Sequence, residues 1–525
     1  MKRHLIYISI AVIFILSFMP SCLKDHGNYE YTDAPEIIID TAGMDRMVLY
    51  ANLSVGTTIS GFAPKVTYTK GETGLEYAWF IHKWIYRPVQ QGNSMVYPPV
   101  DTLCTTRELK WEISEEPDRY ALYFSVHDPE LDITRVFNWG MITITSAGTK
   151  SGLYLLSEYN GNTDIDVYTS ALMLIFGGDS FTPKLFSTLN GGEMIPGKPR
   201  LISFGRDYYY AFTEQQGLRI SPENLMVMDN FEQMFYQPVV YNPQAMVYAN
   251  GVCEFLINDG KLHIMYTNQA NDRKFSAPIA GDYYAAPYLS SVTWVSYGAI
   301  EGAINSEQVI FDKQSNSFVP YFPRTSSVSR FKSTDPQAVI DVNNMPGTLK
   351  HSMQGGSNYV MNIMDINGAP WLYIVNFSNV VDDGDLSALG DGSKLSLAGC
   401  PGILDAKLFT TTRNGSAMYY SVGNKVYTYS YTSGISNATL IWEGSAAEEV
   451  TSMYVMPSGG FPTAGCILWI AAWNESTKEG RLIEFEIDPY AGTPRTQWIG
   501  SFAPTHSNPY ITTGLGKITS MTVKM

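Results

Sequence analysis

Catalytic signatures are the clearest absence from this sequence of 525 residues. It contains no His-Glu-x-x-His zinc motif, no Gly-x-Ser-x-Gly nucleophile turn, no Cys-x-x-Cys pair and no phosphate-binding Walker loop. The seven histidines are scattered and form no ligand cluster in the sequence. We therefore identify no catalytic residue, no metal site and no cofactor, and we expect a protein that binds rather than one that catalyses.

Charged residues are also scarce, at 16% of the chain, and acidic residues outnumber basic ones by 50 to 35. No run of basic residues exists, and a nucleic-acid-binding surface normally carries a basic patch, so nucleic acid is excluded as a partner. Cysteine is sparse too. Beyond the N-terminal region there are four cysteines, Cys104, Cys253, Cys400 and Cys466. One or two disulfides among them are possible, although isolated buried thiols are favoured.

Long apolar runs are confined to the N-terminus, where residues 5–19 follow a short basic start. Fifteen residues suit a signal peptide and are too few for a membrane span, which needs about 20. The run ends in "MPSC", which resembles the lipobox of bacterial lipoproteins, although Met19 and Pro20 depart from its strict pattern. We expect residues 1–21 to be a signal peptide and residues 22–34 to be lipidated Cys22 with a polar tether. The alternative is a plain signal peptide with an incidental cysteine.

Residues 35–148 carry period-two alternation of apolar and polar residues, which is typical of antiparallel strands. "LEYAWFI" and "YALYFSV" are the clearest cases, and "MITIT" closes the segment. Trp79 stands in the middle of its strand, where immunoglobulin-like sandwiches place a core tryptophan, and "PDRY" resembles a tyrosine corner. We therefore predict an immunoglobulin-like β-sandwich over residues 35–148.

Three stretches are similar to the PKD-like family of Bacteroidota lipoproteins: "DHGNYEY" after Cys22, "YAWF", and "YALYFSVHDPELDITRVF". PKD-type domains pair a Tyr-x-Trp strand with a strand that ends in Val-x-Asp, and Val126-His127-Asp128 fits that pattern. The family also has a long β-rich C-terminal region. The resemblance implies an outer-membrane lipoprotein beside a Sus-like uptake system, with that transporter and its lipoproteins as partners. Lys24-Asp25 faintly resembles the export signal of lipoproteins that face the cell exterior.

Residues 150–525 consist of short apolar segments separated by Gly, Asn, Asp and Ser turns. "EEVTSMYVM" at 448–456 returns as "GKITSMTVKM" at 516–525, and "NDGKLHIMY" at 258–266 returns as "VGNKVYTYSY" at 422–431. Such self-similarity predicts a β-propeller, with about seven blades and eight as the alternative. The final strand would pair with "GLYLLSE" to close the ring and remove an exposed edge. The expected fold class is all-β throughout.

Aromatic residues, 13% of the chain, offer the best lead to a binding site. Flat rings stack on the apolar face of a sugar or on a peptide side chain. The candidates are Tyr283, Tyr284, Tyr288, Trp294, Tyr297 and Trp371, most of them in a stretch that the sequence indicates is a loop.

The expected function is the capture of a glycan or peptide by a lipoprotein of the outer membrane, facing the exterior, as an accessory to nutrient uptake. One alternative is a propeller hydrolase or lyase whose carboxylates come from different blades. Another is a structural partner within an outer-membrane complex.

Overall fold

The structure is a computed structural model. It describes residues 35–41, 53–84, 89–91, 94–96, 99–144, 151–173, 180–249, 253–267, 273–290, 308–322, 325–328, 330–331, 333–334, 339–355, 359–377, 385–386, 392–432, 434, 436–457, 463, 465–495 and 508–524. Its contacts divide the chain into two compact units. The first is made of Met1–Arg46, Thr58–Trp111 and Tyr120–Met141, and the second of Met47–Thr57, Glu112–Arg119 and Ile142–Met525.

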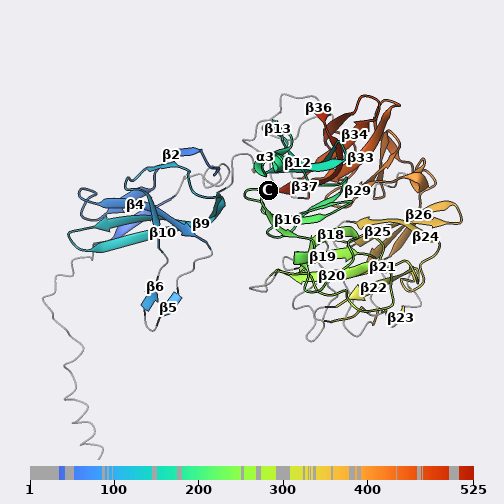
Figure 1. Ribbon diagram of the computed structural model, residues 1–525, viewed down its shortest axis with the longest axis horizontal. Coiled ribbons are helices and arrows are strands. Elements are labelled where there is room, and N and C mark those ends of the chain that lie inside the picture. Colours follow the sequence, from blue (N-terminus) through green and yellow to red (C-terminus); the bar gives the residue numbers. More distant parts are fainter. Residues whose placement is uncertain are drawn as a thin grey trace, which may run out of the picture. The chain divides into compact units, whose positions relative to one another are not determined.

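The first unit is built from antiparallel strands (Figure 1). Its main sheet has the order β10-β9-β4-β7, and β1-β3, β2-β8 and β5-β6 are two-stranded pairs. The bounds are β1 (Ile37–Asp40), β2 (Thr58–Phe62), β3 (Lys65–Tyr68), β4 (Glu76–Lys83), β5 (Val89–Gln91), β6 (Ser94–Val96), β7 (Asp101–Cys104), β8 (Leu109–Glu112), β9 (Asp118–Asp128) and β10 (Ile133–Ile144). The predicted immunoglobulin-like β fold is confirmed.

Trp79 lies at the centre of this unit, as the sequence predicts, with none of its side chain exposed. Its ring centroid lies 4.7 Å from that of Phe124 and 6.0 Å from those of Phe62 and Trp139, so strands of two sheets meet on it. Its indole Nε1 donates to the carbonyl of Arg107 at 3.2 Å, which satisfies the one polar atom of a buried indole.

The second unit is a series of antiparallel sheets that follow the chain around a ring (Figure 1). Within the described residues there are seven such sheets. The first is β13-β12-β11-β37, with β11 (Gly152–Tyr159), β12 (Asn162–Thr169), β13 (Ser180–Thr182) and β37 (Lys517–Lys524). The second is β14 (Pro199–Phe204), β15 (Tyr209–Thr213), β16 (Gly217–Ile220) and β17 (Val227–Asn230), and the third is β18 (Pro243–Ala249), β19 (Cys253–Asn258) and β20 (Lys261–Tyr266).

The remaining four sheets repeat this pattern with up to four strands each. The fourth is β21 (Gln308–Asp312) and β22 (Ser317–Tyr321); the fifth is β24 (Thr348–Gln354), β25 (Tyr359–Ile366), β26 (Ala369–Asn376) and β28 (Ser393–Ser396). The sixth is β29 (Phe409–Thr411), β30 (Ala417–Val422), β31 (Lys425–Ser430) and β32 (Thr439–Glu443). The seventh is β33 (Glu448–Val455), β34 (Ile467–Asn474), β35 (Glu479–Glu486) and β36 (Tyr510–Leu515).

Short elements complete the unit. They are a parallel pair, β23 (Ser333–Thr334) with β27 (Asp385–Leu386), a five-residue helix α3 (Leu185–Leu189), and the 3-10 turns η1 (Glu232–Met234) and η2 (Ile403–Asp405). Among the described residues no helix is long and apolar enough to cross a membrane.

The ring closes as the sequence predicts, because β37 pairs with β11 in antiparallel register from Gly152↔Lys524 onward. The sequence repeats occupy equivalent places: β33 and β37 are the first strands of their sheets, and β20 and β31 are third strands after tight hairpins. This architecture is a β-propeller. The number of blades stays a prediction.

Apolar clusters fill the spaces between neighbouring sheets. One joins the first sheet to the seventh, and others join the third to the fourth and the fifth to the sixth. Three cysteines contribute buried thiols to these layers, namely Cys253, Cys400 and Cys466, while Cys104 in the first unit is half-buried. The core of the propeller is thus a ring of layers rather than one central cluster.

Candidate functional site

The two edges of the propeller sheets differ in their connections. At one edge, which we call the hairpin edge, the second strand of each sheet is joined to the third. In three sheets this connection is a two-residue turn with positive φ at both residues, Asn160-Gly161, Asp259-Gly260 and Asn367-Gly368, and such turns favour Asn or Asp followed by Gly. Because the strands alternate in direction, the connections from first to second and from third to fourth strands fall at the opposite edge, which we call the loop edge.

Residues 291–307 form the connection between Ser290 and Gln308, and only these two flanking residues are described. The Gln308 side chain donates from Nε2 to the Ser290 carbonyl at 2.9 Å. Gln308 is fully buried and Ser290 is 6% exposed, so this hydrogen bond fixes the base of the connection. The connection carries Trp294 and Tyr297, which lie outside the described residues.

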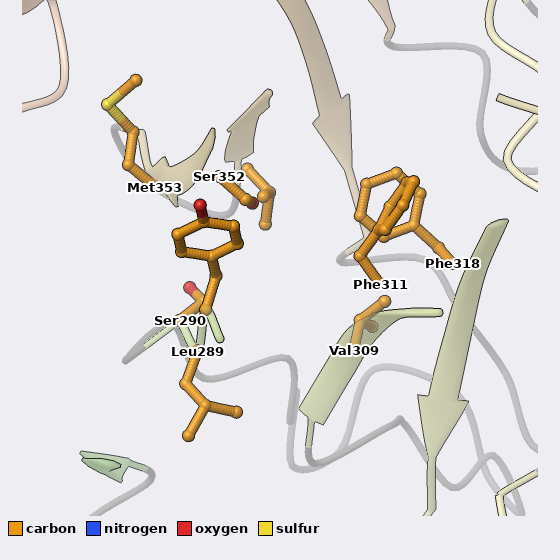
Figure 2. Close-up of a pocket in the computed structure, with 9 residues that line it drawn as sticks. Leu289, Ser290, Val309, Phe311, Phe318, Ser352 and Met353 are labelled. Atoms are coloured by element: carbon orange, nitrogen blue, oxygen red, sulfur yellow. The ribbon is translucent and has the colours of Figure 1, made fainter. Parts of the chain in front are cut away.

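A small pocket adjoins this base, between the fourth and fifth sheets (Figure 2). Leu289 and Ser290 line one side, Ser352 and Met353 of β24 lie across from them, and Val309 lies with Phe311 and Phe318. Its volume is about 10 Å³, enough for about one water molecule. Two hydroxyls, a thioether and apolar groups therefore meet where the connection leaves the sheet.

Tyr288 also lines the pocket and contacts β24, the first strand of the fifth sheet. Its hydroxyl donates to the Lys350 carbonyl at 2.9 Å, and its ring meets His351 edge-on with centroids 4.5 Å apart. His351 in turn stacks on Phe409 of β29 at 4.6 Å. Burial lowers the pKa of His351 to about 3, so this imidazole is neutral and serves as a packing ring.

Tyr283 and Tyr284, although adjacent to this region in sequence, lie elsewhere. Tyr283 is 1% exposed; its hydroxyl donates to the Ile279 carbonyl at 2.7 Å and accepts from the Leu262 N–H at 3.1 Å. Burial raises its pKa to about 12, and its ring belongs to the core between the third and fourth sheets. Tyr284 covers the hairpin edge, where a Cβ at Gly260 would come within 2.4 Å of its ring.

Trp371 is half-buried and follows the Asn367-Gly368 turn directly, so it lies toward the hairpin edge. It packs against the apolar layer that Tyr288 also contacts. Among the described candidates, Tyr288 is therefore the one that reaches the pocket. Trp294, Tyr297 and Cys22 lie outside the described residues, and their assigned roles stay predictions.

A polar cluster between the second and third sheets was missed by sequence reasoning. Glu254, 1% exposed on β19, accepts from the Tyr210 hydroxyl at 2.5 Å and from the Arg206 N–H at 2.8 Å. Burial raises its pKa, and these hydrogen bonds oppose the rise. Gly205 is required here, because a Cβ would lie 2.2 Å from Glu254 Oε1. The signal in the sequence was a single carboxylate in the apolar run "VCEFLI".

Other buried carboxylates are likewise bonded within the scaffold. Glu484 of β35 accepts from Trp469 Nε1 at 2.6 Å and from Ser170 Oγ at 2.9 Å, and Asp312 accepts from the Tyr284 N–H at 2.9 Å. These groups lie on different sheets. Within the described part of the chain, no group of three or more His, Cys, Asp or Glu side chains could hold a metal ion. The buried carboxylates act as internal ties between strands and sheets.

Comparison with known proteins finds a family that is similar to the N-terminal part of the chain. The model of the PKD-like family matches residues 22–199, which confirms the resemblance for that stretch. No curated protein matches the chain.

Similar solved structures match the chain only distantly. A quinoprotein alcohol dehydrogenase-like protein from Bacteroides thetaiotaomicron is 11% identical with a TM-score of 0.38, over 84% of this chain and 91% of that one. Hsv2p from Kluyveromyces lactis is 9% identical with a TM-score of 0.34, over 64% and 90% of the two chains. A putative TolB from Agrobacterium tumefaciens is 10% identical with a TM-score of 0.31, over 56% and 87%. At these values none of the three indicates what this chain binds or does.

Proposed function

We propose that this protein is a lipid-anchored lipoprotein of the outer membrane, facing the cell exterior, that captures a glycan or peptide at the loop edge of its propeller. The observation that carries the proposal is the pocket at the base of residues 291–307. A connection with two large aromatic residues starts and ends beside a small site that already presents Tyr288 and two serine hydroxyls. Aromatic faces with a few placed polar groups are the usual means of holding a sugar or a peptide side chain.

The disposition of carboxylates supports binding over hydrolysis. A glycoside hydrolase needs two carboxyl groups that face each other across an open site, about 5 to 10 Å apart. The carboxyl groups of Glu254, Glu484 and Asp312 are buried on different sheets and accept hydrogen bonds from the scaffold. None of them lines the pocket between the fourth and fifth sheets.

The anchor and the cellular role follow from other parts of the chain. Cys22 after the apolar N-terminal run supports lipidation, and two or more acyl chains give stable anchoring because each buried CH₂ contributes about 0.8 kcal/mol. The PKD-like resemblance supports a place beside a Sus-like transporter and its lipoproteins, to which the captured ligand would pass.

A binding screen with product analysis tests the proposal. The chain from Leu23 onward is applied to arrayed polysaccharides and peptides, and each ligand that binds is recovered and analysed. We expect unchanged ligand, and binding that weakens at least about tenfold in Trp294→Ala and Met353→Ala, a loss of about 1.4 kcal/mol. Tyr490→Ala is the matched control, because this tyrosine is 68% exposed in the turn after β35.

Two results would overturn the proposal. Shortened products would identify a hydrolase or lyase. Binding that falls equally in Tyr490→Ala, or no binding to any compound, would remove the pocket as the site of capture.

A further inference from the structure

Exposed apolar side chains concentrate in the segment that contains the last strand of the second sheet and continues toward the third sheet. Of the fourteen large hydrophobic residues that are exposed among the described residues, five fall within 226–240. Met226, Val227 and Met228 are 46%, 43% and 52% exposed, and Tyr236 and Val240 are 54% and 68% exposed. We call these five the apolar edge. Isolated exposed hydrophobic residues need no explanation, but a concentration in one segment does.

The apolar edge includes an open strand. In the described structure, β17 pairs with β16 on one side and is the last strand of its sheet. Successive side chains of a strand point to opposite faces, so the exposure of both Val227 and Met228 means that neither face of β17 is covered. An exposed edge with apolar side chains is a template for a further strand.

The apolar edge rests on a firm base. Directly after β17, Phe231, Met234 and Phe235 are buried in the layer between the second and third sheets. The Tyr241 hydroxyl donates to the Thr213 carbonyl at 2.7 Å, which holds the end of the segment against the β15–β16 hairpin. The edge is therefore preorganised, which lowers the entropy that a docking partner would have to overcome.

The charges around the apolar edge restrict what can cover it. No Lys or Arg occurs from residue 220 to residue 260, and the basic groups that reach the segment from other elements are Arg200, which acts electrostatically on Tyr241, and Lys524, which donates to the Pro222 carbonyl. Arg219, the last before this stretch, is 8% exposed and is paired with Asp229, so its charge is neutralised locally. Exposed Glu232 and Asp259 add negative charge, and Asp259 follows Asn258, whose side chain bonds to the Val240 carbonyl at 2.8 Å.

We propose that the apolar edge docks an extended segment of a partner protein that carries apolar side chains together with Lys or Arg. Such a segment adds a strand beside β17 and pairs its basic residues with the acidic surroundings. A second copy of this chain would bring acidic residues against acidic residues, and anionic lipid headgroups would be repelled in the same way. The apolar edge is separate from the Tyr288 pocket, so this proposal does not depend on the proposed function.

Binding of designed peptides to the full chain tests the proposal. One fluorescent peptide of about eight residues alternates Val and Thr between Lys pairs; a second is identical except that Glu replaces Lys. Fluorescence anisotropy is measured with the wild-type chain, with Val227→Lys/Met228→Lys, and with Tyr490→Lys as the matched surface control. The substituted positions are about half-exposed, so folding is retained, and thermal unfolding checks this.

We expect the Lys peptide to bind at least about tenfold more tightly than the Glu peptide and to lose at least about tenfold in the double variant, with Tyr490→Lys unchanged. Equal binding of the two peptides, or binding that survives the double variant, would overturn the proposal. Dimerisation of the wild type in sedimentation experiments that the double variant abolishes would assign the edge to a second copy. Attachment to phosphatidylglycerol vesicles that the double variant abolishes would assign it to lipid.

Discussion

Asp166 makes the propeller less stable as pH rises, and its replacement by Asn should reveal this. Its carboxylate is fully buried on β12, where it accepts from the Tyr159 hydroxyl at 2.9 and 3.0 Å and from the Lys184 N–H at 2.7 Å. Burial raises its pKa from 3.8 to about 6, and the nearby Asp164 adds to the rise. At a pH between these two pKa values, Asp166 therefore holds a proton in the folded chain that it has already released in the unfolded chain.

The sign and size of the effect follow from this difference. Between about pH 4 and 6 the folded state binds more protons than the unfolded state, so the unfolding free energy falls as pH increases. A shift of one pKa unit corresponds to 1.36 kcal/mol, so the rise to about 6 costs about 3 kcal/mol at neutral pH. Asp166→Asn does not titrate. Its Oδ1 can still accept from Lys184, and its Nδ2 can donate to the Tyr159 hydroxyl.

Denaturant titrations of wild type and Asp166→Asn at several pH values between about 3.5 and 7 measure the effect. We expect the stability of the variant relative to wild type to increase by about 3 kcal/mol over this range. Asp282→Asn makes the same chemical change at an exposed position and is the matched control. A flat difference for Asp166→Asn, or one that falls with pH, would refute the account of burial as the cause.

Two further predictions concern the polar cluster and the anchor. Gly205→Ala should lower the unfolding free energy by about 1–3 kcal/mol, because the new methyl displaces Glu254 from two hydrogen bonds. In a double-mutant cycle, Gly205→Ala should cost less in the Glu254→Ala background than in the wild type. An equal cost in the two backgrounds would contradict the mechanism. Cys22→Ala should abolish the incorporation of labelled palmitate and move the chain out of the detergent phase. Cys104→Ala should still incorporate palmitate and stay in the detergent phase. Incorporation of palmitate into Cys22→Ala would exclude this cysteine as the lipid site.

Closure of the ring was predictable because it leaves a trace in sequence. Strands β33 and β37 have the same place in consecutive sheets and contact neighbouring layers in the same way, so both keep a Thr-Ser-Met core. A repeat with these spacings is incompatible with a simple sandwich. Trp79 was predictable for a similar reason, since a large apolar ring in the middle of an alternating strand must face inward.

The roles of adjacent tyrosines were not predictable. Alternation says that Tyr283 and Tyr284 point to opposite sides, but it does not say which side is the core. Ala285, Ala286 and Pro287 indicated a loop, yet the Ala286 N–H donates to the Phe311 carbonyl at 2.8 Å and both alanines are buried. This segment runs beside β21, where Ala285 forms an antiparallel bridge with Asp312, a long-range pairing that local sequence patterns do not reveal.

The buried carboxylates explain why binding and stability can be changed separately in this propeller. Glu254 joins the second sheet to the third through Tyr210, and Glu484 accepts from Ser170, which follows β12 of the first sheet. These hydrogen bonds hold neighbouring sheets together, and none of them involves a residue that lines the pocket. Ser352→Ala removes only a hydroxyl at the pocket and should therefore alter ligand binding with little change in stability, whereas Gly205→Ala should do the reverse.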